Sequence, residues 1–264
     1  MRIAPIIAYH GVEQTLPDVR GVCFGGRTFV LNALRVTLPS FRNQLSFLRQ
    51  KGYRSVGLDE IMAARESEGR QTEKIFAMTF DDGFNDLHFP TKRLLREFGY
   101  TATVFLVAGK ITDEGRNGFL TWQQVREMRR EGFRFGAHTL SHPFLTSIGL
   151  EEARREICDS KRIIEEKLQT GIDFFCYPFG DFDSTTINLV KDAGFKGALV
   201  TPTRPGTAET PFTMRRVGVN RGNSMFTFKT KLSGSYDVFR DNRTLYQISR
   251  VRQRLLLSLT TEVE

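Results

Sequence analysis

The stretch "IFAMTFDDGFND", residues 75–86, runs an apolar segment directly into two carboxylates and a glycine. A short apolar run that ends at turn residues predicts a strand buried on both faces, as in a parallel sheet. Adjacent side chains on a strand point to opposite faces, so Asp81 and Asp82 can reach one site only where the strand becomes a loop, with Gly83 supplying the freedom. A turn or a helix N-cap is the alternative for this triplet taken alone.

Similar apolar segments recur along the chain and predict parallel strands separated by amphipathic helices. The predicted strands are "PIIAYH" (5–10), "KIFAMTF" (74–80), "ATVFLVA" (102–108), "RFGAH" (134–138), "FFCYPF" (174–179), "GALVT" (197–201) and "RRVGV" (215–219). The predicted helices lie within 41–53, 89–100, 121–133, 150–169 and 183–195.

Four of the helical segments end in glycine followed by an aromatic residue, at Gly52, Gly99, Gly132 and Gly194. This pair is typical of a helix C-cap whose next side chain returns to the core. The repeated unit of strand, loop, helix and cap predicts an α/β barrel, closed or nearly closed, of about seven parallel strands. No GxGxxG motif follows a strand, which disfavours an open nucleotide-binding sheet.

The pattern predicts a single domain over residues 1–264, with a core at about 5–220 and a C-terminal helical extension at about 221–264. Within the extension, "LYQISRVRQRLLLSL" (245–259) predicts a basic amphipathic helix. That helix either packs on the barrel or contacts anionic lipid at a membrane surface.

Composition limits the partners and the compartment. The formal charge of +8 and the pI of about 9.6 favour anionic partners, but no basic stripe interleaved with aromatic residues indicates nucleic-acid binding. Three cysteines without CxxC spacing argue against a disulfide framework. We expect a soluble, cytoplasmic protein because neither a signal peptide nor a transmembrane segment is apparent; peripheral contact with the inner membrane face stays open.

Two further strand ends carry chemistry. His138 and His142, in "AHTLSHP", are four residues apart, so within one helical turn both imidazoles would face a divalent metal. In "CYPFG" the backbone N–H of Phe179 could face a reacting group, although the motif alone is a turn. One Asp with two His forms a donor set for Zn²⁺ or another first-row divalent ion, and a second carboxylate beside it suits hydrolysis of an amide or ester.

These motifs resemble the polysaccharide deacetylase family, also called the NodB-homology domain or carbohydrate esterase family 4. "TFDDG" (79–83), "HTLSH" (138–142) and "YPFG" (177–180) carry the resemblance, which extends over about residues 5–220. It implies a distorted (β/α) barrel that removes acetyl groups from glycans. It further implies that Asp81 is the general base, that Asp82, His138 and His142 hold the metal, and that the N–H of Phe179 stabilises the oxyanion.

The sequence departs from the family pattern at two places. The arginine expected two residues before the motif proline is replaced by Cys176, so Arg216 is the candidate to orient Asp81, with Arg215 as the weaker alternative. The general-acid histidine expected near the C-terminus is absent, because no histidine follows His142. The opening "IIAYHGV" resembles the circularly permuted branch that acts on exopolysaccharide and poly-N-acetylglucosamine, which implies that His10 is the acid.

The sequence therefore predicts a metal-dependent hydrolase that removes N-acetyl groups from a glycan or a glycan precursor. The metal is expected to be Zn²⁺, with Co²⁺, Ni²⁺ or Mn²⁺ as alternatives, and the substrate is an acetylated glycan or a lipid-linked sugar. Two other hypotheses stay open: a metal amidohydrolase acting on a non-sugar amide, and a non-catalytic carbohydrate-binding protein on a decayed barrel. Oligomeric state is not predicted.

Overall fold

The computed structural model describes residues 4–14, 21–24, 27–30, 34–66, 73–115, 118–201 and 207–234. The predicted helix at 245–259 lies outside these ranges, and the single-domain boundaries stay a prediction. Within the described ranges, no helix combines the length and the apolar character needed to cross a membrane.

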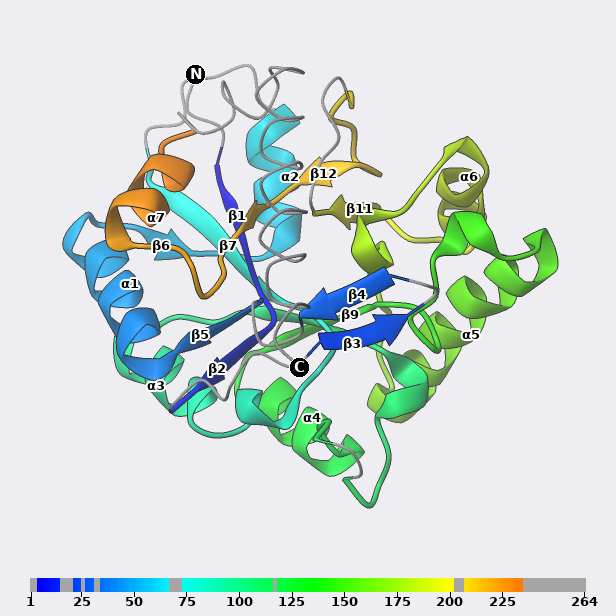
Figure 1. The fold of residues 1–264 in the computed structure, drawn as a ribbon, viewed down its shortest axis with the longest axis horizontal. Coiled ribbons are helices and arrows are strands. Elements are labelled where there is room, and N and C mark those ends of the chain that lie inside the picture. Colours follow the sequence, from blue (N-terminus) through cyan, green and yellow to red (C-terminus); the bar gives the residue numbers. More distant parts are fainter. Residues whose placement is uncertain are drawn as a thin grey trace, which may run out of the picture.

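The core of the fold is a curved, parallel sheet that nearly closes into a barrel surrounded by helices, as the sequence predicts (Figure 1). Its strands lie in the order β12-β11-β10-β9-β8-β7-β1-β13, and β6 pairs with β7 off this path. Their bounds are β1 Ile6–Tyr9, β6 Arg54–Ser55, β7 Ile75–Phe80, β8 Thr103–Leu106, β9 Arg134–Ala137, β10 Phe174–Cys176, β11 Gly197–Val200, β12 Met214–Arg215 and β13 Val217–Gly218.

One short segment joins the two edges of this sheet. β12 pairs with β11 through Leu199 and Met214, and β13 pairs with β1 through Ile7 and Val217. Only Arg216 separates β12 from β13. The predicted last strand is therefore two short pieces, one on each side of the seam, with an arginine between them.

Two smaller sheets lie outside the barrel and were not predicted. β2 (Gly11–Glu13) pairs in parallel with β5 (Arg35–Thr37), and β3 (Gly21–Phe24) forms an antiparallel hairpin with β4 (Arg27–Val30). The strand predicted at 174–179 is shorter than expected. It ends at Cys176 because Pro178, which has no N–H for the sheet, begins a 3₁₀ turn, η5 (Pro178–Gly180).

The five predicted helices are all present, and two more accompany them. The helices are α1 Leu38–Gln50, α2 Leu58–Glu66, α3 Thr91–Phe98, α4 Trp122–Arg130, α5 Leu150–Leu168, α6 Ser184–Asp192 and α7 Met225–Leu232. The unpredicted α2 and α7 each bury only two residues, too few to give a recognisable helical period.

The predicted glycine caps are confirmed. Gly52, Gly99, Gly132 and Gly194 have φ angles of 72°, 71°, 92° and 77°, in the left-handed region. In each case the N–H of the following aromatic residue bonds back to a carbonyl of the helix; that of Tyr53, for example, donates to Leu48 at 3.0 Å. The caps thereby turn the chain from each helix into the next buried segment.

Two layers of apolar side chains pack against β7. Phe76, Met78 and Phe80 belong to the large cluster that includes the helices, whereas Ile75 and Ala77 belong to a smaller cluster. That smaller cluster fills the barrel interior with side chains from the facing strands, among them Ile6, Phe105, Phe174, Leu199 and Met214. The alternation of side chains along each strand thus decides what points into the barrel.

Candidate active site

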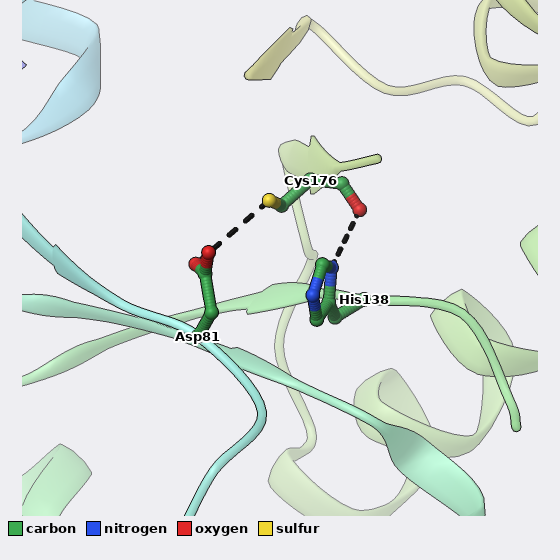
Figure 2. A group of neighbouring side chains, drawn as sticks. All are labelled: Asp81, His138 and Cys176. Carbon is green, nitrogen blue, oxygen red and sulfur yellow. Dashed lines mark hydrogen bonds between the residues drawn. The ribbon is translucent and has the colours of Figure 1, made fainter. Parts of the chain in front are cut away.

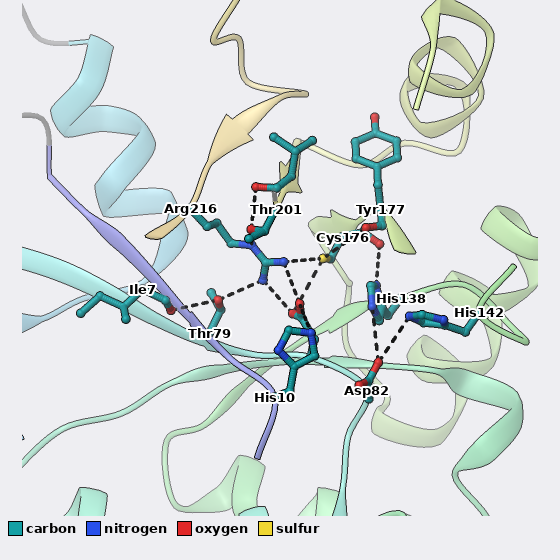
Figure 3. A network of polar contacts seen from close by, with 12 residues as sticks. Ile7, His10, Thr79, Asp82, His138, His142, Cys176, Tyr177, Thr201 and Arg216 are labelled. Carbon is teal, nitrogen blue, oxygen red and sulfur yellow. Dashed lines mark hydrogen bonds and ion pairs between the residues drawn. The ribbon is translucent and has the colours of Figure 1, made fainter. Parts of the chain in front are cut away.

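The same alternation carries polar groups into the upper end of the barrel interior. Inward-facing positions on a strand are two residues apart. On each strand, the next inward-facing position after those in the barrel interior lies at the carboxyl rim. The rim residues reached in this way are Asp81 after β7 (Figure 2) and, in Figure 3, His10 after β1, His138 after β9, Cys176 in β10, Thr201 after β11 and Arg216 after β12. Residues far apart in sequence therefore meet above one apolar core.

Asp81 and Arg216 form a buried, two-pronged ion pair. Nη1 and Nη2 of the guanidinium each donate to one carboxylate oxygen at 2.7 Å. The same guanidinium donates to the hydroxyls of Thr79, at 3.1 Å, and Thr201, at 2.8 Å. Burial acts to raise the pKa of Asp81, but the charge of Arg216, its hydrogen bonds and the nearby His138 and His10 together outweigh burial and hold the pKa well below its ordinary value. Asp81 is consequently an anion with a fixed orientation.

Cys176 lies beside this pair, where the family pattern has an arginine. Its Sγ is 3.0 Å from Nη2 of Arg216 (Figure 3) and 3.8 Å from Oδ1 of Asp81 (Figure 2). Burial raises the pKa of the Cys176 thiol well above its ordinary value, so the thiol stays neutral. The structure places Arg216 against Asp81, whereas the alternative, Arg215, bonds instead to the carbonyl of Thr207.

Asp82, His138 and His142 converge on the other side of Asp81. Oδ1 of Asp82 is 3.6 Å from Nε2 of His138 and 3.4 Å from Nε2 of His142, and one potential ligand atom from each residue lies within 4.8 Å of the others. Nδ1 of His138 contacts the carbonyl of Cys176 at 2.7 Å. A carbonyl only accepts, so Nδ1 carries the proton and the lone pair of Nε2 faces Asp82.

The backbone of this cluster differs from the prediction. Asp82 itself has a left-handed φ of 71°, one residue before the predicted pivot, Gly83 (φ 82°). The predicted helical turn from His138 to His142 is wrong: Thr139 and His142 have φ angles of 66° and 70°, and the segment is an irregular turn. Pro143 disfavours helical geometry at His142. Left-handed conformations cost energy for these residue types, and such conformations cluster at functional sites.

The protonation states suit a cation. Burial lowers the pKa of His138 to about 3 and that of His142 to about 4, which keeps both imidazoles neutral, as ligands must be. Burial raises the pKa of Asp82 to about 6, because this carboxylate has no guanidinium like that of Asp81 against it. Ligands about 2.0–2.2 Å from a tetrahedral ion lie roughly 3.3–3.6 Å apart. The 3.4 and 3.6 Å separations therefore fit a zinc-like centre.

Asp81, His138 and Cys176 form a second group, in which one potential ligand atom from each residue lies within 4.8 Å of the others (Figure 2). Its chemistry does not fit a metal. Both oxygens of Asp81 bond to Arg216, and the Cys176 thiol keeps its proton. The group whose chemistry suits a metal is therefore Asp82, His138 and His142, while Asp81 lies beside it in its ion pair with Arg216.

His10 lies beside Asp81, and Phe179 lies beside His142. Nε2 of His10 is 3.8 Å from Oδ2 of Asp81, and the His10 side chain is 22% exposed. Phe179 has a φ of 58°, and its ring stacks on Phe144 at 4.0 Å and contacts the ring of His142 at 4.5 Å. His10 thus has access to solvent and to Asp81, and the Phe179 turn borders the histidine ligands.

Several supporting residues were not singled out from the sequence. Thr79 and Thr201 bind the guanidinium of Arg216, and Asp181 accepts hydrogen bonds from the backbone and hydroxyl of Thr146. Glu156 accepts hydrogen bonds from the turn between the two histidines. A signal existed only for Glu156, which interrupts the apolar face of its helix with a charge.

A parallel barrel that gathers two carboxylates, imidazoles and a buried arginine at its carboxyl rim has the construction of a barrel hydrolase. Residues 68–198 match the family model of the polysaccharide deacetylases. This match assigns residues 68–198 to the polysaccharide deacetylase family. The matched range contains Asp81, Asp82, His138, His142 and Phe179, while His10 and Arg216 lie outside it.

Relatives and solved structures agree with this assignment. YxkH of Bacillus subtilis, itself assigned to the polysaccharide deacetylases, is 25% identical over 227 residues, which are 85% of this chain and 74% of the relative. The poly-β-1,6-N-acetyl-D-glucosamine N-deacetylase of Escherichia coli K12 is 24% identical over 72% of this chain, but the match spans only 32% of that enzyme. Peptidoglycan-N-acetylglucosamine deacetylase of Bacillus cereus is 30% identical over 48% of this chain and 56% of its own length.

Two solved structures share the fold. The Streptococcus pyogenes deacetylase PplD, in complex with acetate, superposes with a TM-score of 0.72 at 23% identity and covers 87% of this chain and 97% of its own. IcaB from Ammonifex degensii gives a TM-score of 0.70 at 23% identity, covering 88% and 98%. The predicted distorted (β/α) barrel and the predicted family are both confirmed.

Proposed function

We propose that this chain is a metal-dependent deacetylase that hydrolyses N-acetyl groups on a glycan or glycan precursor. One observation carries the proposal: an ionised carboxylate, fixed by a buried arginine, stands beside a separate donor set of two neutral imidazoles and a carboxylate. General-base hydrolysis at a metal centre requires those two components side by side.

In this proposal Asp82, His138 and His142 hold the ion. Zn²⁺ is the first choice for this donor set, and Co²⁺, Ni²⁺ and Mn²⁺ are alternatives. The bound ion supplies Lewis acidity, which acidifies a water and polarises the acetyl carbonyl. Cys176 contributes only its carbonyl, which holds the His138 ring in the tautomer that presents Nε2.

Asp81 is the proposed general base. Its carboxylate takes a proton from the attacking water as the new C–O bond forms, and its low pKa ensures that the base is ionised at neutral pH. Arg216 holds both oxygens and thereby fixes the direction of approach. The N–H of Phe179 is the proposed donor to the oxygen that gains negative charge.

His10 is the proposed general acid. When the C–N bond breaks, the leaving amine needs a proton, and His10 is the imidazole nearest to Asp81 outside the metal set. Its Nδ1 is buried and bonds to no partner among the described residues. The products are acetate and a free amino sugar, and Asp81 passes the proton it accepted to His10, 3.8 Å away, which restores both groups.

The proposed substrate is an N-acetylated glycan, because the E. coli and B. cereus relatives are named for N-acetylglucosamine polymers. No contact among the described residues favours the lipid-linked form that the sequence left open. The cytoplasmic location and the peripheral membrane contact stay predictions.

Calorimetric titration of metal-stripped protein with zinc, followed by acetate release from chitin oligomers and poly-N-acetylglucosamine, tests this function. We expect one site in the native protein, lost in His138→Ala, and acetate release that disappears in Asp81→Asn. Zinc binding without acetate release from any N-acetylated glycan, but with hydrolysis of a non-sugar amide, would replace the glycan substrate. Absence of zinc binding would remove the mechanism.

A further inference from the structure

A buried carboxylate outside the metal set supports the turn between the two histidines. Glu156 lies on the buried face of α5 and is 7% exposed. Its Oε2 accepts the N–H groups of Leu140 and Ser141, both at 2.8 Å, and its Oε1 accepts the hydroxyl of Ser141 at 2.6 Å. A charge this deeply buried is costly unless it is hydrogen-bonded, so these three donors account for its presence.

The turn that Glu156 supports has no regular secondary structure of its own. Its ends, Thr139 and His142, are left-handed, and the hydroxyl oxygen of Thr139 accepts the N–H of His142 at 2.9 Å. On the opposite side, the carbonyl of Leu140 accepts the N–H of Gly109 at 2.9 Å. Glu156 provides the acceptor for the two N–H groups that lie between the left-handed residues.

We infer that Glu156 is a positioning residue that sets the 139–142 turn and, through it, directs His142 toward the metal. The inference rests on the proposed function. His142 ends the turn, and its Nε2 lies 3.4 Å from Oδ1 of Asp82. A shift of the peptide between Leu140 and Ser141 would therefore rotate the imidazole away from that oxygen. Residues behind metal ligands typically change metal affinity about 10- to 100-fold when they are removed.

Two substitutions separate the hydrogen bonds from the charge. Glu156→Gln removes the charge, but its carbonyl oxygen still accepts the two N–H groups, and its amide can donate to the Ser141 hydroxyl. Glu156→Ala removes the bonds as well. Glu165→Ala is the matched control, because Glu165 is on the same helix and accepts a backbone N–H, that of Ile172 at 2.9 Å, far from the turn.

The experiment is calorimetric titration of each metal-stripped full-length variant with zinc, together with the visible absorption spectrum of the cobalt-loaded protein. We expect Glu156→Ala to raise the Kd for zinc about 10- to 100-fold and to change the cobalt spectrum. Glu156→Gln should largely restore both, and Glu165→Ala should match the native protein. Amide hydrogen exchange at residues 140 and 141 of the metal-free protein should be faster in Glu156→Ala.

The outcomes are distinguishable. If Glu156→Ala binds zinc with the native Kd, the positioning role is refuted and the proposed function stands. The same conclusion follows if Glu156→Gln loses as much zinc affinity as Glu156→Ala. If the native protein binds no zinc, both the positioning role and the proposed function are refuted, and this result does not depend on the variants. If Glu156→Ala does not fold, Ser141→Ala removes one bond; a Kd above the native value supports the role, and an unchanged Kd overturns it.

Discussion

The buried pair of Asp81 and Arg216 should be strongly coupled in stability, because both residues are at most 4% exposed. Asp81→Asn leaves the guanidinium charge without a counter-charge inside the barrel. Arg216→Met leaves the Asp81 carboxylate without either of its 2.7 Å donors and deprives Thr79 and Thr201 of their partner. Removing one member of a buried pair costs about 3–5 kcal/mol, so each single variant should lose that much.

The double variant Asp81→Asn with Arg216→Met removes both charges together. It should be less destabilised than the sum of the single variants by about 2–3 kcal/mol, the upper range for directly contacting residues. The assay is urea denaturation of the metal-free protein at pH 7, followed by fluorescence of Trp122, the only tryptophan, which is 3% exposed. Circular dichroism gives an independent curve.

Arg42→Met is the matched control. Arg42 and Glu97 form the same two-pronged contact, at 2.5 and 3.0 Å, but both side chains are 50% exposed. Solvent screens such pairs, so the control should change stability little. The reasoning is refuted if the Asp81 and Arg216 single variants behave like the control, or if their effects simply add in the double variant.

Three further predictions concern the site. His10→Gln should lower kcat for acetate release about 10²- to 10⁴-fold with the zinc Kd unchanged, and a parallel loss of zinc binding would contradict the general-acid role. The free energy of unfolding of the metal-free protein should rise by about 1.4 kcal/mol per pH unit from pH 4 to 6. Below pH 6.5, unfolding lets His138 and His142, whose pKa values are about 3 and 4 in the folded protein, each take up a proton. Unfolding also makes Asp82, whose folded pKa is about 6, release a proton, so the net uptake is about one proton. Urea titrations at each pH measure this dependence, and in the double variant His138→Gln, His142→Gln stability should instead fall as the pH rises. A native protein whose unfolding free energy does not change with pH would contradict the prediction. Gly109→Ala should weaken zinc binding, since a Cβ there would lie 2.6 Å from the carbonyl oxygen of Leu140, whereas Gly149→Ala, with open space around it, should not; equal zinc Kd values in calorimetry would contradict this.

The strand pattern predicted much of the site because alternation along a strand is local. Once 75–80 is a strand whose odd-numbered positions face inward, Asp81 must reach the rim, and the same counting carries His10 and His138 there. Arg216 was proposed only through the family resemblance, as a replacement for the arginine missing at Cys176, with Arg215 as the weaker alternative. Its contact with Asp81 spans 135 residues, a separation at which no local pattern operates.

Other features depend on tertiary contacts that the sequence does not display. Asp82 is left-handed in addition to the predicted pivot, Gly83, and the left-handed His142 replaces the predicted helical turn; such backbone needs support from its surroundings. For the turn that ends at His142, the support comes from Gly109 and Glu156, which lie outside the turn in sequence. The pairing of β2 with β5 likewise joins segments too short to be recognised alone.

The seam at Arg216 determines when during folding the catalytic end of the barrel can form. The segment 214–218 is the last part of the barrel to leave the ribosome, yet it pairs with β1, synthesised some 210 residues earlier, as well as with β11. Until it docks, both of those strands present unpaired edges on which other chains can assemble, and Asp81 has no guanidinium. A chain shortened before residue 214 should therefore lose acetate release and solubility together, because one short segment protects the edges and supplies the arginine that holds Asp81.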